Sequence, residues 1–370
     1  MKSFVPELDR LKAMGRYRSL SLPAGIDFSS NDYLGLSSHP DLRQTAIQAL
    51  ESGIEIGAAG SRLLRGHRQA HEELEIFAAS YFGCQRALFF ANGFQANYAL
   101  ITTLIKRQDV AIYDALCHAS MRDGMHASAC ITLKVPHNDL NAFEEALKKT
   151  RPADAQAWIL VESLYSMDGD LAPVRDLLAL AEKYDAILIV DEAHGTGVLG
   201  ATGKGATEGL PHDRLISLHT CGKALGVAGA LVCATDEVVD YLINAARPFI
   251  YSTAPMPLQA ALVKRALELV QSEPERRAQL RELQAVAAKC LPDYPVKSQI
   301  IPLRVGEDAE AVAIAKALQA QGFDIRAIRP PTVPKGTARL RLSLNVGLTP
   351  QDIERFAQAF TTLMSSRVAA

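Results

Sequence analysis

The chain has 370 residues, of which 48% are apolar and 22% charged, a composition typical of globular proteins. Lys and Arg number 39 against 41 Asp and Glu, a formal charge of −2, and the absence of a basic tract argues against nucleic-acid binding. The six cysteines form no CxxC pair and are interpreted as reduced core residues. Since no apolar leader or membrane-length run occurs, we expect a soluble, cytoplasmic protein.

The predicted elements alternate regularly through the middle of the chain. Helices at 5–14, 40–52 and 69–82 come first. Apolar strands then alternate with helices of about ten residues or more. The strands are expected at 87–91, 110–113, 130–133, 158–161 and 187–190, and the helices at 95–105, 118–128, 140–149 and 173–183. This alternation indicates parallel strands joined by right-handed crossovers.

The pattern changes beyond residue 236. A helix-rich stretch at 257–291 precedes strands at 298–303, 324–328 and 340–344 and helices at 309–321 and 350–364. Few strands with helices suggest a separate α+β domain, and 370 residues exceed what one core usually fills. We therefore predict an N-terminal segment (1–45), a large domain (46–250) and a C-terminal small domain (251–370).

Two predicted strands are followed by groups suited to chemistry. The strand at 187–190 ends in Asp191, Glu192 and His194, and the strand at 215–218 leads into a small-residue turn carrying Lys223. Ligands bind at the carboxyl ends of parallel strands. An isolated turn lysine is typically a surface residue, but Asp191 and His194 favour a Schiff-base site. There, the lysine supplies the imine nitrogen and an acid holds a protonated pyridine nitrogen.

A strand-to-helix turn at 92–97 offers backbone N–H groups at a helix N-terminus, which suits a phosphate group. Alone it is an ordinary turn; Thr220 and Lys223 strengthen the functional interpretation. His118 starts another helix and either stacks on an aromatic cofactor or caps the helix, with equal weight.

Two further patterns stay open. The polar residues at 162–170 follow a core strand and suit either hydrogen bonding to a bound ring or a polar turn. Arg339 and Arg341 alternate with leucines, so one face of that strand should point inward. A buried arginine needs a carboxylate partner, supplied by the protein or by a substrate.

Two other motifs carry no function. The GxGxxG match at 195–200 does not directly follow its strand or open a helix, so the dinucleotide-binding context is missing. His67 and His71 are four residues apart but lack the HExxH order and an evident third ligand. We expect no metal site.

The segments Asp191-Glu-Ala-His-Gly195, Ser166-Met-Asp-Gly169 and Thr220-Cys-Gly-Lys223 together resemble the α-oxoamine synthases, which use pyridoxal 5'-phosphate (PLP). The resemblance extends from Asn31 to the C-terminal helix. It implies an α/β fold of the PLP-dependent transferase fold type I (aspartate aminotransferase-like), with a large parallel-rich sheet domain and a smaller α+β C-terminal domain. The segment 328–341 is most similar to biotin-pathway members, which condense L-alanine with pimeloyl-CoA or pimeloyl-acyl carrier protein and release CO2 and the thiol.

The resemblance also implies residue roles. Lys223 would bind the cofactor covalently, Asp191 would pair with the pyridine nitrogen, and His118 and His194 would complete the catalytic set. The remaining expected cofactor contacts are Gly93, Phe94, Ser166, Thr220 and Thr253. The expected substrate contacts are Arg341, Thr332, Asn31 and Arg16 or Arg18. The family's active site lies at a homodimer interface, so a homodimer is implied.

Two alternatives are kept. The segment 61–67 approaches the pattern of glycine-using relatives, such as 2-amino-3-oxobutyrate or 5-aminolevulinate enzymes, whereas Arg329-Pro-Pro-Thr332 argues against them. A non-catalytic PLP- or nucleotide-binding scaffold is the alternative from a different class. Lys223, Asp191 and His194 argue against a scaffold, because a mere binder needs no imine lysine.

Overall fold

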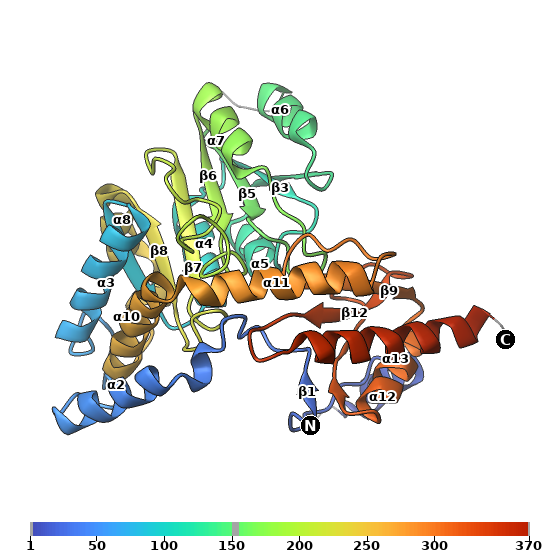
Figure 1. Cartoon of the computed structure of the whole chain (residues 1–370). Helices are drawn as coiled ribbons and strands as arrows, with labels where there is room; N and C mark the ends of the chain where they lie inside the picture. Colours follow the sequence, from blue (N-terminus) through green and yellow to red (C-terminus); the bar gives the residue numbers. More distant parts are fainter. Residues whose placement is uncertain (1–2, 150–154, 369–370) are drawn as a thin grey trace. The chain divides into compact units, whose positions relative to one another are not determined.

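The computed structural model describes residues 3–149 and 155–368 (Figure 1). The chain divides into two compact units. The large unit comprises Leu34–Ser166 and Asp170–Arg277, and the small unit comprises Met1–Tyr33, Met167–Gly169 and Ala278–Ala370. The three-part division into domains at 1–45, 46–250 and 251–370 stays a prediction.

The large unit contains a seven-stranded sheet with the order β2-β8-β7-β6-β5-β3-β4. Its strands are β2 (Arg86–Phe90), β3 (Val110–Asp114), β4 (Ile131–Val135), β5 (Ala157–Glu162), β6 (Ala186–Asp191), β7 (Leu215–Thr220) and β8 (Ala230–Ala234). The predicted parallel pairing is confirmed from β4 through β3, β5 and β6 to β7. β8 is antiparallel to β7, because the link 221–229 is too short for the crossover that a parallel pair needs. β8 is also antiparallel to β2.

Helices cover both faces of this sheet. They are α2 (Pro40–Glu51), α3 (Gln69–Phe82), α4 (Gly93–Leu104), α5 (Ala119–Ser128), α6 (Leu140–Lys149), α7 (Val174–Lys183), α8 (Asp236–Ala245), α9 (Arg247–Ile250) and α10 (Pro257–Ser272). One apolar cluster joins the sheet to α4, α5 and α8, and another joins it to α6 and α7. Along β5, Leu160 belongs to the first cluster and Ile159 to the second. Burial on both faces explains the continuous apolar runs of these strands.

The small unit contains two short sheets. β1 (Ile26–Asp27) pairs with β10 (Phe323–Asp324), and β12 (Ala338–Ser343) lies between β11 (Ala327–Ile328) and β9 (Ile300–Gly306). Its helices are α1 (Val5–Ala13), α12 (Asp308–Gln319) and α13 (Pro350–Val368), and α11 (Pro274–Cys290) enters it from the large unit. The prediction of one strand at 324–328 is wrong, because β10 and β11 pair in different sheets.

Among the described residues, no helix is both long enough and apolar enough to cross a membrane.

Candidate active site

Lys223 and His194 meet in the large unit. Lys223 lies in the turn after β7, where the Gly226 N–H donates to the Lys223 carbonyl oxygen at 2.8 Å. His194 lies in the turn after β6 and is 5% exposed. The Lys223 Nζ atom is 2.7 Å from His194 Nε2. The turn lysine is therefore held beside a group that can exchange a proton with it.

Asp191 ends β6 and is buried. Its Oδ1 atom accepts a hydrogen bond from the Ala193 N–H at 2.9 Å, and its Oδ2 atom accepts one from Asn97 Nδ2 at 2.7 Å. Asn97 Nδ2 also donates to Ser120 Oγ at 3.0 Å. Both carboxylate oxygens are therefore held by groups without a charge.

His118 caps α5, since its Nδ1 atom accepts from the Ser120 N–H at 3.2 Å. The capping interpretation is confirmed, and stacking on a cofactor stays a prediction. Burial lowers the pKa of His118; Asp191 raises it and Lys223 lowers it further. Hydrogen bonds through Ser120 and Asn97 connect His118 to Asp191.

Glu162 ends β5, where it pairs in register with Asp191. Burial raises the pKa of Glu162 to about 8, and the nearby Asp191 contributes to this shift. Its Oε2 atom accepts from the Ser166 N–H at 3.1 Å. At pH 7 Glu162 is therefore protonated, so it places Ser166 without adding a second negative charge beside Asp191.

The N-terminus of α4 has the features of a phosphate site. Asn92 caps the helix, its Oδ1 atom accepting from the Gln95 N–H at 2.8 Å. The N–H groups of Gly93 and Phe94, at the start of α4, have no acceptor within the helix. A Cβ atom at Gly93 would collide with Thr220 Oγ1, so the hydroxyl lies directly against this turn. Backbone amides and a hydroxyl at a helix N-terminus suit an anion.

A cavity of about 550 Å³ opens beside this helix end. Phe94 and Thr253 both line it. The donor set of the large unit thus fits PLP: an amine at Lys223, a carboxylate at Asp191, and amides with the Thr220 hydroxyl for a phosphate.

The predicted substrate residues lie in the small unit. Arg341 is 8% exposed on β12. Its Nη1 atom donates to Asn31 Oδ1 at 2.9 Å, and its Nη2 atom donates to the Tyr33 hydroxyl at 3.1 Å. Arg18 Nη2 donates to Thr332 Oγ1 at 3.5 Å.

One expectation about the arginines needs correction. Both the arginine face and the leucine face of β12 are buried, so the expectation of a single inward face is wrong. Arg339 forms an ion pair with Asp168 at 2.6 Å, which is the internal salt bridge considered above. Arg16 Nε is 3.0 Å from Asp308 Oδ2, so this arginine also pairs within the protein.

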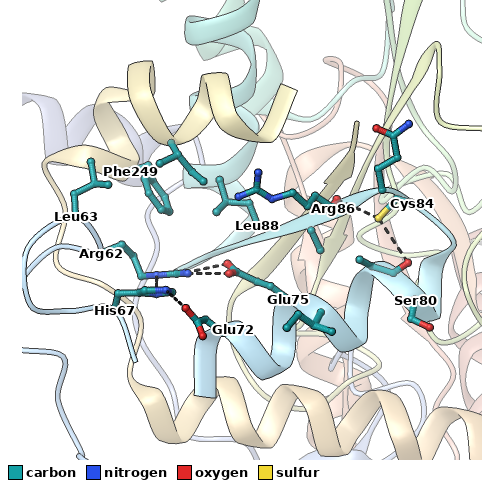
Figure 2. Close-up of a pocket in the computed structure, with 15 residues that line it drawn as sticks. Arg62, Leu63, His67, Glu72, Glu75, Ser80, Cys84, Arg86, Leu88 and Phe249 are labelled. Atoms are coloured by element: carbon teal, nitrogen blue, oxygen red, sulfur yellow. Dashed lines mark hydrogen bonds and ion pairs between the residues drawn. The ribbon is translucent and has the colours of Figure 1, made fainter. Parts of the chain in front are cut away.

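Another cavity of the large unit, of about 580 Å³, has a different character (Figure 2). The Arg62 guanidinium donates to both carboxylate oxygens of Glu75, at 3.0 and 2.8 Å, and His67 Nε2 is 3.0 Å from Glu72 Oε1. None of its described lining residues belongs to the predicted site. Because these charged groups pair with one another, we do not place the active site there.

Known proteins share this fold. The family model for aminotransferase class I and II matches residues 23–360. The chain belongs to the aminotransferase class I and II family. It is 43% identical to the 8-amino-7-oxononanoate synthase of Chromobacterium violaceum, over 92% of each chain. The solved structure of the Francisella tularensis 8-amino-7-oxononanoate synthase has a TM-score of 0.80 at 27% identity, covering 93% of this chain and 99% of that one.

A solved structure of serine palmitoyltransferase (SPT) with a PLP internal aldimine has a TM-score of 0.89 at 26% identity. The match covers 98% of this chain and 97% of that one. The prediction of a PLP-dependent transferase fold type I is therefore confirmed.

Proposed function

We propose that the chain catalyses the decarboxylative condensation of L-alanine with a pimeloyl thioester, with PLP as its cofactor. The products are 8-amino-7-oxononanoate, CO2 and the thiol, and the reaction belongs to biotin biosynthesis. The observation that carries the proposal is the Lys223–His194 contact of 2.7 Å, in a chain 43% identical to an 8-amino-7-oxononanoate synthase over 92% of both chains.

Bound PLP supplies an electron-withdrawing ring that stabilises negative charge on the α-carbon of an attached amino acid. The Lys223 amine holds the cofactor and later removes the α-proton. His194 Nε2, at 2.7 Å, can share that proton with the amine. Asp191 would pair with the ring nitrogen, where an adjacent negative charge would favour the protonated form of that nitrogen.

The other large-unit residues orient the cofactor. The N–H groups of Gly93 and Phe94 and the Thr220 hydroxyl bind its phosphate, because they form an anion site at the start of α4. Ser166, whose backbone N–H is fixed by Glu162, and His194 would contact the ring hydroxyl. His118 would cover one face of the ring. Thr253, which lines the cavity beside α4, would reach the phosphate bound by a partner subunit, and this role requires a homodimer.

Arg341 binds the substrate carboxylate. Its contacts with Asn31 and Tyr33 hold the guanidinium in one orientation, and a planar guanidinium with parallel donors matches a carboxylate. Of the two N-terminal arginines, we propose Arg18 as the one that serves the substrate, together with Thr332. Arg16 is used in its ion pair with Asp308. Because the donor is a CoA or carrier-protein thioester, we place the reaction in the cytoplasm.

The test is a substrate panel on the PLP-loaded protein. Thiol release and product mass are measured for L-alanine, glycine and L-serine, each with pimeloyl-CoA and pimeloyl-acyl carrier protein. We expect L-alanine to give the largest kcat/KM. A preference for glycine would transfer the function to a glycine-using α-oxoamine synthase. A protein that binds PLP but releases no thiol with any pair would support the scaffold alternative.

A further inference from the structure

Asn97 lies on α4 with its side chain buried against Asp191. It is 1% exposed, and its Nδ2 atom donates to Asp191 Oδ2 at 2.7 Å and to Ser120 Oγ at 3.0 Å. Ser120 is fully buried and lies next to the proposed ring-covering histidine. One amide therefore contacts the proposed ring-nitrogen partner directly and reaches His118 through a single hydroxyl.

The neutrality of this amide matters for Asp191. A lysine or arginine at the same position would hold the carboxylate equally well, but its positive charge would offset the negative charge that a ring nitrogen needs. Asn97 donates a hydrogen bond without contributing a charge. The Ala193 N–H holds the other oxygen at 2.9 Å. A carboxylate offers about four acceptor positions, so both oxygens are fixed and acceptor positions remain for a ligand.

The hydrogen bonds that continue from Asn97 have a consistent direction. Ser120 Oγ accepts from Asn97, so its own hydrogen can point to His118 Nδ1, which is 2.8 Å away. The Ser120 N–H also donates to His118 Nδ1, at 3.2 Å. Nδ1 is then an acceptor, and in a neutral ring the proton resides on Nε2. Asn97 thus sets the orientation of Asp191. By donating to Ser120 Oγ it also aims the Ser120 hydroxyl at His118 Nδ1, which the Ser120 N–H already makes an acceptor.

We propose that Asn97 is a positioning residue of the reaction, acting on Asp191 directly and on His118 through Ser120. This rests on the proposed function, in which Asp191 faces the ring nitrogen of PLP. The residue does not touch the reacting atoms. Its role is to keep the Asp191 carboxylate aimed at the ring nitrogen, so its loss should change the protonation of that nitrogen before any substrate is added.

The test compares Asn97→Leu, which keeps a similar volume without a donor, with Thr103→Val, which removes a buried hydroxyl from the same helix. The first readout is the ¹⁵N NMR shift of the ring nitrogen in labelled PLP bound to each protein without substrate. We expect this shift to move toward the unprotonated position in Asn97→Leu only. Losing a hydrogen bond to a charged group should lower kcat by roughly 10- to 100-fold, with a much smaller change in KM for L-alanine.

Two further variants keep the proposal falsifiable if Asn97→Leu does not fold. Asn97→Ser retains a donor and should lose less activity than Asn97→Leu. Ser120→Ala removes the hydroxyl between Asn97 and His118. It keeps the backbone N–H on His118 Nδ1 and the Asn97–Asp191 bond, so it should leave the ring-nitrogen shift in place. Its effect should also be less than additive with Asn97→Leu, because the two residues share one network.

The outcomes separate this inference from the proposed function. A protonated ring nitrogen in the wild type that persists in Asn97→Leu, with kcat within twofold, would overturn the role of Asn97 alone. A wild-type protein whose bound PLP has no protonated ring nitrogen would overturn the role of Asp191 as well. A ring signal that depends on Asn97 in a protein that prefers glycine would support the role of Asn97 and correct only the substrate.

Discussion

The buried aspartates at the ends of β3 and β6 have similar backbone positions and very different partners. Asp114, at the end of β3, is fully buried, and its Oδ1 atom is 2.9 Å from His137 Nδ1. The other ring nitrogen of His137 is 2.8 Å from Asp170 Oδ2. Asp191, at the end of β6, is held instead by the Asn97 amide and the Ala193 N–H.

The histidine between the two carboxylates is charged at neutral pH. Burial acts to lower the pKa of His137, but the hydrogen bonds that its ring nitrogens donate to Asp114 and Asp170 outweigh burial and raise the pKa to about 9. The imidazolium therefore offsets part of the negative charge of Asp114 and Asp170, and it ties the strand end to the segment that carries Ser166. The Asp114 carboxylate is therefore used to stabilise the fold, whereas the Asp191 carboxylate is oriented by neutral groups for a ligand.

The largest expected effect comes from removing the charge of Asp191. Asp191→Asn keeps the shape of the side chain but cannot favour a protonated ring nitrogen. We expect kcat to fall by about 10²–10³-fold, with little change in the free energy of unfolding. Steady-state thiol release, together with urea unfolding of the same samples, measures both quantities. A variant that turns over like the wild type would show that the negative charge of Asp191 is not used.

At the cluster of Asp114, His137 and Asp170 we expect a substitution to lower the stability of the fold. His137→Gln keeps hydrogen-bonding capacity but leaves Asp114 and Asp170 without the positive charge between them. Breaking a buried ion pair by removing one partner is strongly destabilising, and for this partly exposed histidine we expect a loss of about 2–4 kcal/mol in urea unfolding at pH 7. Unchanged stability would mean that the imidazolium does not stabilise the fold.

The pH dependence of stability sharpens the same contrast. A pKa of about 9 in the folded protein lies above the unfolded value of about 6.5. The stabilisation is therefore complete below about pH 6.5 and is lost as the pH rises through 9. Urea unfolding between pH 6 and about pH 10 should show this decline. The decline of the free energy of unfolding with pH should be flatter in His137→Gln. Parallel curves for the variant and the wild type would show that His137 does not cause the decline.

The smallest effect is expected at Glu162, on the strand between the two aspartates. Its pKa of about 8 makes it protonated at pH 7, so Glu162→Gln should keep kcat within about threefold at that pH. The folded pKa of about 8 lies above the ordinary value of 4.5, so the wild type should lose stability relative to the variant as the pH rises from about 4.5 to about 8, and the difference should stay constant above pH 8. A large activity loss at pH 7 would show that Glu162 acts as a charged group.

The alternation of apolar strands with helices could be predicted, because the residue periods of a strand and of a helix are local sequence patterns. The prediction is incomplete where pairing with a distant strand decides which sheet a segment joins. The stretch 324–328 changes sheets between Asp324 and Ala327, and nothing local signals this change. α8 was also not predicted, although Thr235 caps it with a 3.4 Å bond to the Val238 N–H.

The candidate site likewise contains residues that the sequence reveals and residues whose roles depend on distant contacts. Lys223, Asp191 and His194 were found because charged groups at strand ends are conspicuous in a sequence. Asn97 was not, because its role depends on Asp191, 94 positions away. His137 was missed for the same reason, since its two carboxylates are 23 and 33 positions away. Contacts that distant arise only from the order of the strands.

The most direct test of the account is to identify the residue that carries PLP. The PLP-loaded protein is treated with borohydride, which fixes a lysine-bound cofactor, and the labelled peptide is identified by mass spectrometry. We predict a single adduct on Lys223 that is absent from Lys223→Ala. An adduct on a different lysine, or none on a protein that still binds PLP, would contradict the proposed chemistry and make Lys223 a structural residue.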